Sequence, residues 1–184
     1  EFWRSFYTEI RNHYETINGD IIGALRRLQD SGCLEILTCG ATHGYFPLLS
    51  QDESLVLQTR LAVENYRKHF GRSPRGMWLP ECAYRPRGPW LSPLAQAGEA
   101  PTLRAGADEI LAEHGIEFFI VDTHLIRGGK SVEQYGDRFH TPPTAVTPDP
   151  EYPARDTSPH RAWLVRSGDM SQTPVAVFGR DPET

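Results

Sequence analysis

The sequence has little of what marks nucleic-acid-binding and membrane proteins. Its 19 lysines and arginines form no basic run, and 24 aspartates and glutamates leave a formal net charge of −5. We therefore expect no nucleic-acid partner, because such partners require clustered positive charge. No apolar stretch approaches the roughly 18 residues that a membrane-spanning helix needs, so no membrane partner is expected either. No internal repeat is visible.

Cysteine is also scarce. The three cysteines, Cys33, Cys39 and Cys82, are an odd number and lack the spacing of a zinc site. Cys33 and Cys39 flank a predicted strand, and we expect both to be small buried residues. Free thiols are typical of a reducing compartment, which predicts a cytoplasmic location. We expect no metal and no other cofactor.

The chain does contain enough apolar sequence for one globular domain. Hydrophobic residues make up 39% and charged residues 23% of the 184 residues, and this length allows a sizeable core. The first residues already follow an amphipathic helical pattern, and the last residues come directly after a strand-like run. Both ends look truncated, so we expect a portion of a longer protein.

Helical periodicity is clear in the first two thirds of the chain. Apolar spacing predicts helices at 2–17, at 20–30, from Ser50 to residue 70, and near 106–114. Ser50 and Glu53 form a capping-box pattern, and Gly71 is expected to end that helix. Its predicted buried stripe consists of Leu55, Ala62, Val63, Tyr66 and Phe70.

Apolar runs alternate with these helices and predict strands. They lie at 34–39, 76–80, 116–121 and 175–178, and 163–165 is a candidate for a further short strand. The alternation is typical of an α/β fold with a mainly parallel sheet. The proline-containing segment 85–103 is predicted to be a loop. Residues 128–160, with six prolines between 141 and 160, predict a long proline-rich loop or insertion that could act as a lid.

Polar residues follow each of the four predicted strands. They are Thr42 and His43, then Glu81, then Asp122 with His124, then Arg180 with Asp181. Because parallel strands are joined by right-handed crossovers, these segments should emerge at one edge of the sheet. Two imidazoles, three carboxylates and a guanidinium around one cleft would suit a hydroxyl-rich or metal-bound ligand.

Ordinary structural roles stay open for most of these residues. His43 could be a loop histidine bonded to backbone, Asp122 could cap a turn, and Arg180 could simply form a salt bridge. Trp78 could be a core residue rather than a binding platform. Glu81 is the strongest candidate for chemistry, as a nucleophile, a general base or a metal ligand, because a Trp-Leu-Pro run is an unusual route to a plain surface charge.

Two stretches resemble a known family. Residues 35–49 (EILTCGATHGYFPLL) and 78–84 (WLPECAY) resemble signature blocks of glycoside hydrolase family 57, and the second resembles the block that carries its nucleophile. Residues 119–124 (FIVDTH) and 177–183 (VFGRDPE) are most similar to the 1,4-α-glucan branching enzymes of that family. The resemblance covers roughly residues 20–84, 104–127 and 174–184.

This resemblance implies both a fold and an activity. The fold would be part of an incomplete (β/α)7 TIM-like barrel with mainly parallel strands, and residues 1–184 would be its central portion. The activity would be that of a retaining enzyme in glycogen biosynthesis, acting on an α-glucan such as glycogen or amylose. Glu81 matches the nucleophile position. The substrate-binding residues that we expect are His43, Arg180, Asp122, His124 and Trp78.

The same resemblance predicts missing parts and leaves alternatives. The family's general acid, an aspartate, is expected downstream of Thr184, so the isolated fragment is predicted to be inactive. Other activities of the family, α-amylase, amylopullulanase or 4-α-glucanotransferase, stay open. So does a metal-dependent hydrolase on a similar barrel, with His43, Asp122 and His124 as ligands. A third alternative is a non-catalytic glucan-binding or regulatory barrel.

Overall fold

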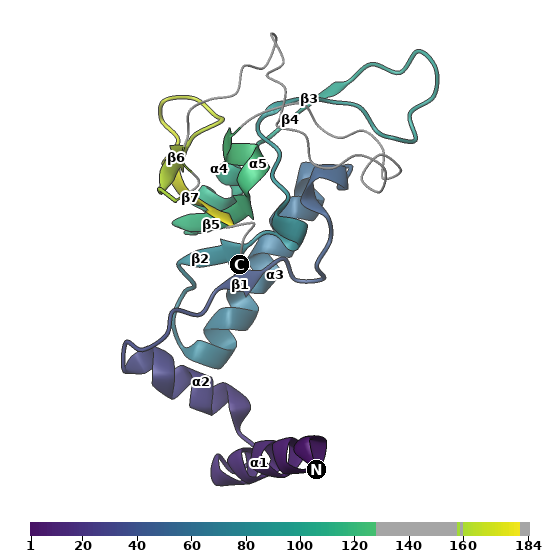
Figure 1. Cartoon of the computed structure of the whole chain (residues 1–184). Helices are drawn as coiled ribbons and strands as arrows, with labels where there is room; N and C mark the ends of the chain where they lie inside the picture. The colour runs from purple at the N-terminus through teal and green to yellow at the C-terminus, as the bar shows by residue number, and fades with distance from the viewer. Residues whose placement is uncertain (128–157, 159, 181–184) are drawn as a thin grey trace.

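The computed structural model describes residues 1–127, 158 and 160–180, and a mostly parallel sheet forms its centre (Figure 1). Most of the predicted loop at 128–160, and Asp181, lie outside the described residues. The strands are β1 (Thr38–Cys39), β2 (Gly76–Trp78), β5 (Phe118–Asp122), β7 (Val175–Arg180) and β6 (Trp163–Val165), in that spatial order. The first four are mutually parallel, and β6 pairs antiparallel with β7. The α/β prediction is confirmed.

Helices precede or follow these strands much as predicted. They are α1 (Phe2–Thr16), α2 (Ile21–Asp30), α3 (Asp52–Phe70), α4 (Ala107–Glu113) and α5 (Thr123–Arg127), with short 3-10 helices η1 (Phe46–Leu48) and η2 (Pro80–Cys82). None of the helices within residues 1–127 is both long and apolar enough to cross a membrane.

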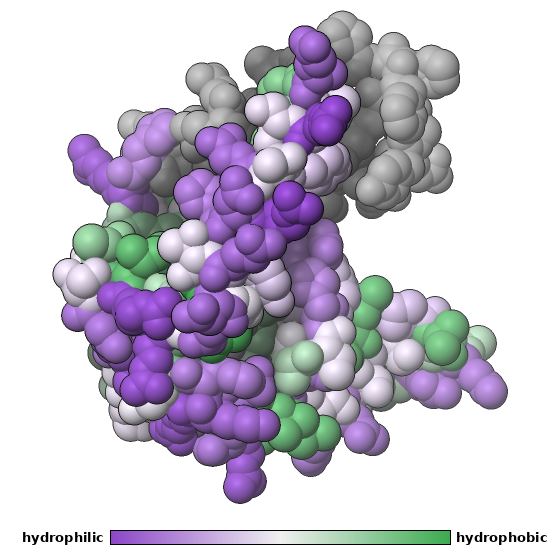
Figure 2. All heavy atoms as spheres, turned by 90° about the horizontal axis from the view of Figure 1, so that it is seen from below, coloured by the Kyte–Doolittle hydropathy of each residue, from purple (hydrophilic) through white to green (hydrophobic). Residues whose placement is uncertain are grey.

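The first two helices extend away from the sheet (Figure 1). Asn18 and Gly19, both with positive φ (53° and 72°), form the turn between them. No residue of α1 is buried, and Trp3 is 64% exposed. On the face shown in Figure 2, hydrophilic residues dominate and exposed hydrophobic residues lie in separate groups.

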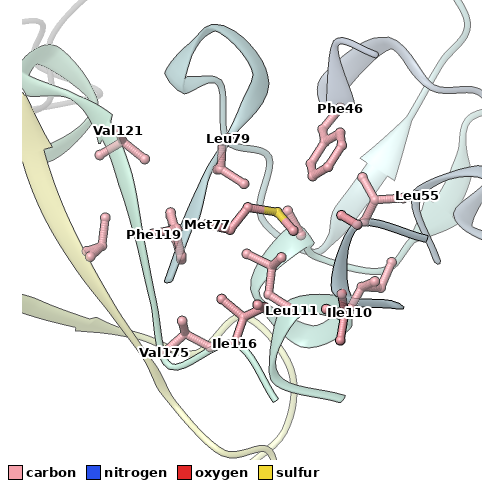
Figure 3. Packing of buried hydrophobic residues seen from close by; sticks show 14 residues of the cluster. Phe46, Leu55, Met77, Leu79, Ile110, Leu111, Ile116, Phe119, Val121 and Val175 are labelled. Carbon is pink, nitrogen blue, oxygen red and sulfur yellow. The ribbon is translucent and has the colours of Figure 1, made fainter. Parts of the chain in front are cut away.

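The core lies on one face of the sheet. Met77 and Leu79 on either side of Trp78, and Phe119 and Val121 in β5, pack against helices α3 and α4 (Figure 3). Alternate residues of a strand point to opposite faces, which explains why the buried positions are two residues apart. The other core members include Phe46, Leu55, Ile110, Leu111, Ile116, Val175 and Val177.

The opposite face of the sheet is more open. Cys39, Trp78, Ile120 and Phe178 form one row across β1, β2, β5 and β7, as the strand registers show. The first three side chains are partly exposed and Phe178 is 42% exposed. This row therefore lies outside the helix-covered core.

Helix α3 begins differently from the prediction. The capping box at Ser50 and Glu53 is wrong, since the helix starts at Asp52 and its N-cap, Gln51, makes no side-chain cap bond. Two acidic side chains in the first turn instead complement the positive end of the helix dipole. The end is as predicted, because Gly71 adopts the left-handed conformation (φ 71°). The predicted buried stripe is confirmed except for Phe70, which is partly buried.

Residues 85–103 are not only a loop. Strands β3 (Gly88–Trp90) and β4 (Thr102–Arg104) pair as an antiparallel hairpin, with Pro89 opposite Leu103. Proline cannot donate a backbone hydrogen bond, so it is tolerated in a two-stranded ribbon only where its nitrogen faces away from the partner strand. The prolines therefore predicted a loop, whereas part of the segment forms a two-stranded ribbon.

The segment before β1 is less regular than predicted. Only Thr38–Cys39 of the expected strand 34–39 pairs with β2. Ile36 donates its N–H to Oε1 of Gln29 (3.1 Å) and accepts at its carbonyl from the Tyr66 hydroxyl (3.1 Å), so side chains replace the sheet ladder. The burial prediction for two cysteines is also wrong: Cys33 is exposed beyond the end of α2, and Cys39 is partly exposed on the open face.

Candidate active site

The carboxyl ends of the four parallel strands meet at one edge of the sheet. Cys39 pairs with Trp78, so the chain segments leading to His43 and Glu81 leave neighbouring strands side by side. Asp122 pairs with Arg180 at the ends of β5 and β7. The predicted convergence is confirmed for the segments of His43, Glu81, Asp122 and Arg180, whereas Asp181 lies outside the described residues.

His43 and Glu81 are in direct contact at this edge. Nε2 of His43 lies 3.1 Å from Oε1 of Glu81, and the two side chains are 52% and 71% exposed. The His43 segment is held from α3, where Gln58 accepts from the Thr42 N–H (2.8 Å) and donates to the Thr42 hydroxyl (2.6 Å). The ring of His43 therefore bonds side chains rather than backbone, and the carboxylate stays open to a ligand.

Glu81 sits in a strained turn. Within η2 it has φ 57° and ψ 25°, and Cys82 follows with φ 52°. A left-handed conformation costs a residue with a Cβ roughly 1–2 kcal/mol. Two backbone bonds close the turn, from Cys82 N–H to the Leu79 carbonyl (2.8 Å) and from Ala83 N–H to the Pro80 carbonyl (3.2 Å). Buried Leu79, Pro80 and Cys82 anchor it.

His43 shares this conformation, with φ 56°. Within the described residues, positive φ outside glycine occurs also at Asn18, so three of the four such positions belong to this one edge. Strained backbone of this kind clusters at functional sites, where surrounding packing enforces it. The edge is therefore built to hold His43 and Glu81 in one arrangement.

A glycine lets the two segments come together. A Cβ on Gly40 would lie 2.9 Å from the Phe46 ring and 3.0 Å from Cγ of Pro80, closer than normal contacts allow. Gly40 directly follows β1, and Pro80 directly precedes Glu81. The absence of a side chain at this position thus sets the spacing between the segments of His43 and Glu81.

Asp122 and Arg180 form an ion pair beside this contact. Nη2 of Arg180 lies 2.9 Å from Oδ1 of Asp122, with side chains 56% and 28% exposed. The Thr123 hydroxyl donates to the backbone carbonyl of Arg180. Burial raises the pKa of the Cys82 thiol, and the Asp122 charge adds to this while the Arg180 charge opposes it. Arg180 thus forms a salt bridge, which leaves a ligand-binding role open, and its charge acts on Cys82 next to Glu81.

Trp78 and His124 are the two remaining candidate residues of the site. Trp78 belongs to the open row of the sheet rather than to the core cluster, so its ring is available on the face that leads to Glu81. His124 lies in α5, directly after β5. Its side chain is outside the described residues.

Sequence reasoning missed one contact of this site. Sγ of Cys39 lies 3.2 Å from Nδ1 of His43, on the side of the ring opposite to Glu81. Burial raises the pKa of the Cys39 thiol, the Gly40 backbone N–H lowers it, and the Glu81 charge raises it further. The thiol therefore keeps its proton at neutral pH. The available signal in the sequence was the spacing of four residues between Cys39, at the end of a predicted strand, and His43.

The same geometry bears on metal binding. Because Cys39 and Glu81 contact opposite nitrogens of His43, these three side chains cannot share one ion. Among the side chains that the structure describes, which do not include that of His124, no three histidine, cysteine, aspartate or glutamate side chains are placed to hold a metal ion.

A parallel α/β sheet that presents a strained, accessible carboxylate with an imidazole partner at its carboxyl edge is an arrangement typical of enzymes. The family model described as Glycosyl hydrolase family 57 matches residues 2–184, and the chain belongs to that family.

Individual relatives show which proteins this chain resembles. Over 180 residues the chain is 39% identical to the 1,4-α-glucan branching enzyme TK1436 of Thermococcus kodakarensis, covering 98% of this chain and 24% of that protein. The crystal structure of a GH57-type branching enzyme from Pyrococcus horikoshii matches with a TM-score of 0.74 and 37% identity, over 99% of this chain and 28% of that one. The crystal structure of the α-amylase AmyC from Thermotoga maritima matches with a TM-score of 0.63 and 28% identity, over 99% of this chain and 26% of that one. The chain thus spans about a quarter of the length of these relatives.

Proposed function

We propose that the protein is a 1,4-α-glucan branching enzyme, which cleaves an α-1,4 link and forms an α-1,6 link with retention of configuration. The similarity to named branching enzymes, at 37–39% identity, exceeds the 28% to an α-amylase. Those names support an α-glucan substrate. A role in glycogen biosynthesis and a cytoplasmic location stay predictions.

The open face of the sheet supports a barrel. We propose that residues 1–184 are the central portion of an incomplete (β/α)7 barrel whose helices lie outside. The row Cys39, Trp78, Ile120 and Phe178 would then face the interior, and strand β1 would gain a neighbour along its free edge. Barrel closure removes such unpaired edges.

The contact between Glu81 and His43 is the observation that carries the mechanism. One oxygen of Glu81 is held by His43, and the 71% exposed carboxylate leaves the other free for attack on the anomeric carbon of a glucan. The bond from that carbon to the leaving oxygen breaks as a general acid protonates that oxygen. The result is a glycosyl ester on Glu81.

The second step reverses the first on a different acceptor. The 6-hydroxyl of another glucan chain attacks the anomeric carbon, its proton passes to the conjugate base of the acid, and the carboxylate of Glu81 is released. Exclusion of water would favour this transfer over hydrolysis. A role of the 128–160 loop in that exclusion stays a prediction, since most of the loop lies outside the described residues.

Other residues of the edge would bind sugar hydroxyls. We propose His43, Trp78 and the Asp122–Arg180 pair for this role because they come from the strand ends next to Glu81, and His124 is proposed with them from the family resemblance. Asp122 is a poor candidate for the general acid, because its Oδ1 is already held by Arg180 at 2.9 Å. The acid is therefore left unassigned.

The test uses the full-length enzyme with Glu81→Gln and, as a matched control, Glu53→Gln in the exposed first turn of α3. We expect Glu81→Gln to lower turnover by about three orders of magnitude or more while glucan binding persists, and the control to match wild type. Unchanged turnover in Glu81→Gln would remove this residue from the mechanism.

Product identity separates the remaining alternatives. Iodine staining followed by enzymatic debranching detects new α-1,6 links, which only a branching enzyme makes. Reducing ends without such links would indicate an α-amylase, and disproportionation of linear chains a 4-α-glucanotransferase. Binding of glucan by the wild-type protein with no product would indicate the non-catalytic alternative.

A further inference from the structure

We propose that Cys39 is a positioning residue of this site: its thiol donates a hydrogen bond to Nδ1 of His43 and so keeps the ring proton on Nε2, facing Glu81. The catalytic consequence of this bond rests on the proposed function. The bond itself does not, because it follows from the geometry of three side chains.

The three side chains form one line. Cys39 ends β1 on the open face of the sheet, and the chain then reverses, with His43 N–H bonded to the Gly40 carbonyl at 2.9 Å. This reversal brings Nδ1 of His43 to 3.2 Å from Sγ of Cys39 and Nε2 to 3.1 Å from Oε1 of Glu81. Each ring nitrogen thus has one partner.

The partners determine which nitrogen carries the proton. An ionised carboxylate only accepts hydrogen bonds, so Nε2 must be the donor toward Glu81. In the neutral ring Nδ1 is then an acceptor and needs a donor, and the Cys39 thiol lies within reach of it. Burial, opposed by the Gly40 N–H and aided by the Glu81 charge, raises the pKa of this thiol, which keeps the donor proton in place at neutral pH.

Loss of the thiol would change the charge of the ring. His43 is 52% exposed, so a bare Nδ1 could take a proton from solvent. The doubly protonated ring would form a full ion pair with Glu81, and such a pair lowers the nucleophilicity of the carboxylate. Among the described side chains, the titratable groups that contact the ring are Cys39 from β1 and Glu81 from η2, with the Asp122–Arg180 pair near the Glu81 segment.

The position of His43 does not depend on Cys39 alone. Gln58 holds the preceding residues through both bonds to Thr42 and through its carbonyl, which accepts from Ala41 N–H at 3.2 Å. Removal of the thiol is therefore expected to leave the segment in place, so that a substitution tests the hydrogen bond rather than the fold.

The experiment compares Cys39→Ala, Cys39→Ser and Cys33→Ala in the full-length enzyme, with kcat and KM measured across pH. We expect Cys39→Ala to lower kcat about tenfold, as the loss of one hydrogen bond would, with KM little changed. The acid limb of its pH profile should move to higher pH, because the ring protonates more readily. Cys39→Ser should restore both, since its hydroxyl also donates, and exposed Cys33→Ala should match wild type.

Two results would overturn the proposal. One is a Cys39→Ala enzyme with wild-type kcat and pH profile, and the other is a Cys39→Ser enzyme as impaired as Cys39→Ala.

A measurement that does not depend on turnover separates the Cys39–His43 hydrogen bond from the proposed function. Nitrogen-15 NMR of histidine-labelled protein, with the His43 signals assigned through His43→Asn, should show a neutral ring protonated at Nε2 and lose that signature in Cys39→Ala. If Glu81→Gln stays active but this signature holds, the mechanism fails and the tautomer assignment stands.

Discussion

Replacement of Asp108 should test how the segment after Glu81 is anchored. Asp108 is fully buried in α4. Its Oδ1 accepts from the Tyr84 hydroxyl (3.0 Å) and the Ser167 hydroxyl, and its Oδ2 accepts from Ser167 N–H (2.7 Å) and from Nε2 of Gln172 (2.9 Å). One carboxylate thus ties the residues that follow Glu81 to α4 and to the turn between β6 and β7.

The size of the effect depends on which oxygen is replaced. In Asp108→Asn the amide nitrogen can occupy the Oδ1 position, where both partners are hydroxyls that can rotate to accept. The two N–H donors at Oδ2 keep an oxygen. We therefore expect a loss of about 2 kcal/mol in unfolding free energy, from weakened charge-assisted bonds. Asp108→Leu leaves donors at both positions unpaired, and we expect about 4 kcal/mol.

The wild type and Asp108→Asn should also differ in how much stability they lose at acid pH. Burial raises the pKa of Asp108, but bonds from Ser167, Gln172 and Tyr84 outweigh it and hold the pKa below its usual value. A carboxylate with a lowered pKa stabilises the fold above the unfolded-state value of about 4 and loses this contribution as pH falls through the folded-state value. The wild type should therefore lose stability below pH ~4 more steeply than Asp108→Asn.

Urea unfolding of the full-length protein, followed by fluorescence at pH 7 and across the acid range, measures both effects. Glu113→Gln, an exposed carboxylate on the same helix, is the matched control and should leave the midpoint unchanged. Equal losses for Asp108→Asn and Asp108→Leu would refute the argument from acceptor geometry. So would an unchanged acid response in Asp108→Asn.

Two further changes test the spacing of the site and the anchoring of the hairpin. Gly40→Ala should lower kcat, because its Cβ would push on Pro80 beside Glu81, whereas Gly44→Ala, with its nearest atom 3.6 Å away, should retain wild-type kcat. Asp52→Ala should cost about 3 kcal/mol in urea unfolding and speed proteolysis of the hairpin, because buried Arg104 loses its carboxylate partner at 2.7 Å. Wild-type stability would mean that other contacts suffice for Arg104.

Much of the fold follows from local sequence pattern. The long periodic segments of α1, α2 and α3 and the apolar runs of β5 and β7 each contain enough residues for their period to be read directly. The β3–β4 hairpin escaped prediction because its strands are three residues each and their pairing depends on a distant partner. The shortened β1 escaped for a similar reason, since Gln29 and Tyr66 from two helices take its backbone bonds.

The sequence predicted which residues lie near one another at the site, but not their backbone conformations or hydrogen bonds. Strand ends in a parallel sheet share an edge, and this rule is enough to predict that His43 and Glu81 lie near each other. Their left-handed backbones and the bond from Cys39 to His43 depend on packing by residues such as Phe46 and Gln58, which no local pattern encodes.

The positive-φ residues set a limit on engineering this protein for heat resistance. A common route replaces such residues by glycine, which relieves about 1 kcal/mol of steric cost. At Asn18, in the turn between two exposed helices, that exchange is free of any chemical penalty. At His43 and Glu81 the same exchange would remove the proposed nucleophile and its partner, so there the strain has to persist in any stabilised variant that is to stay active.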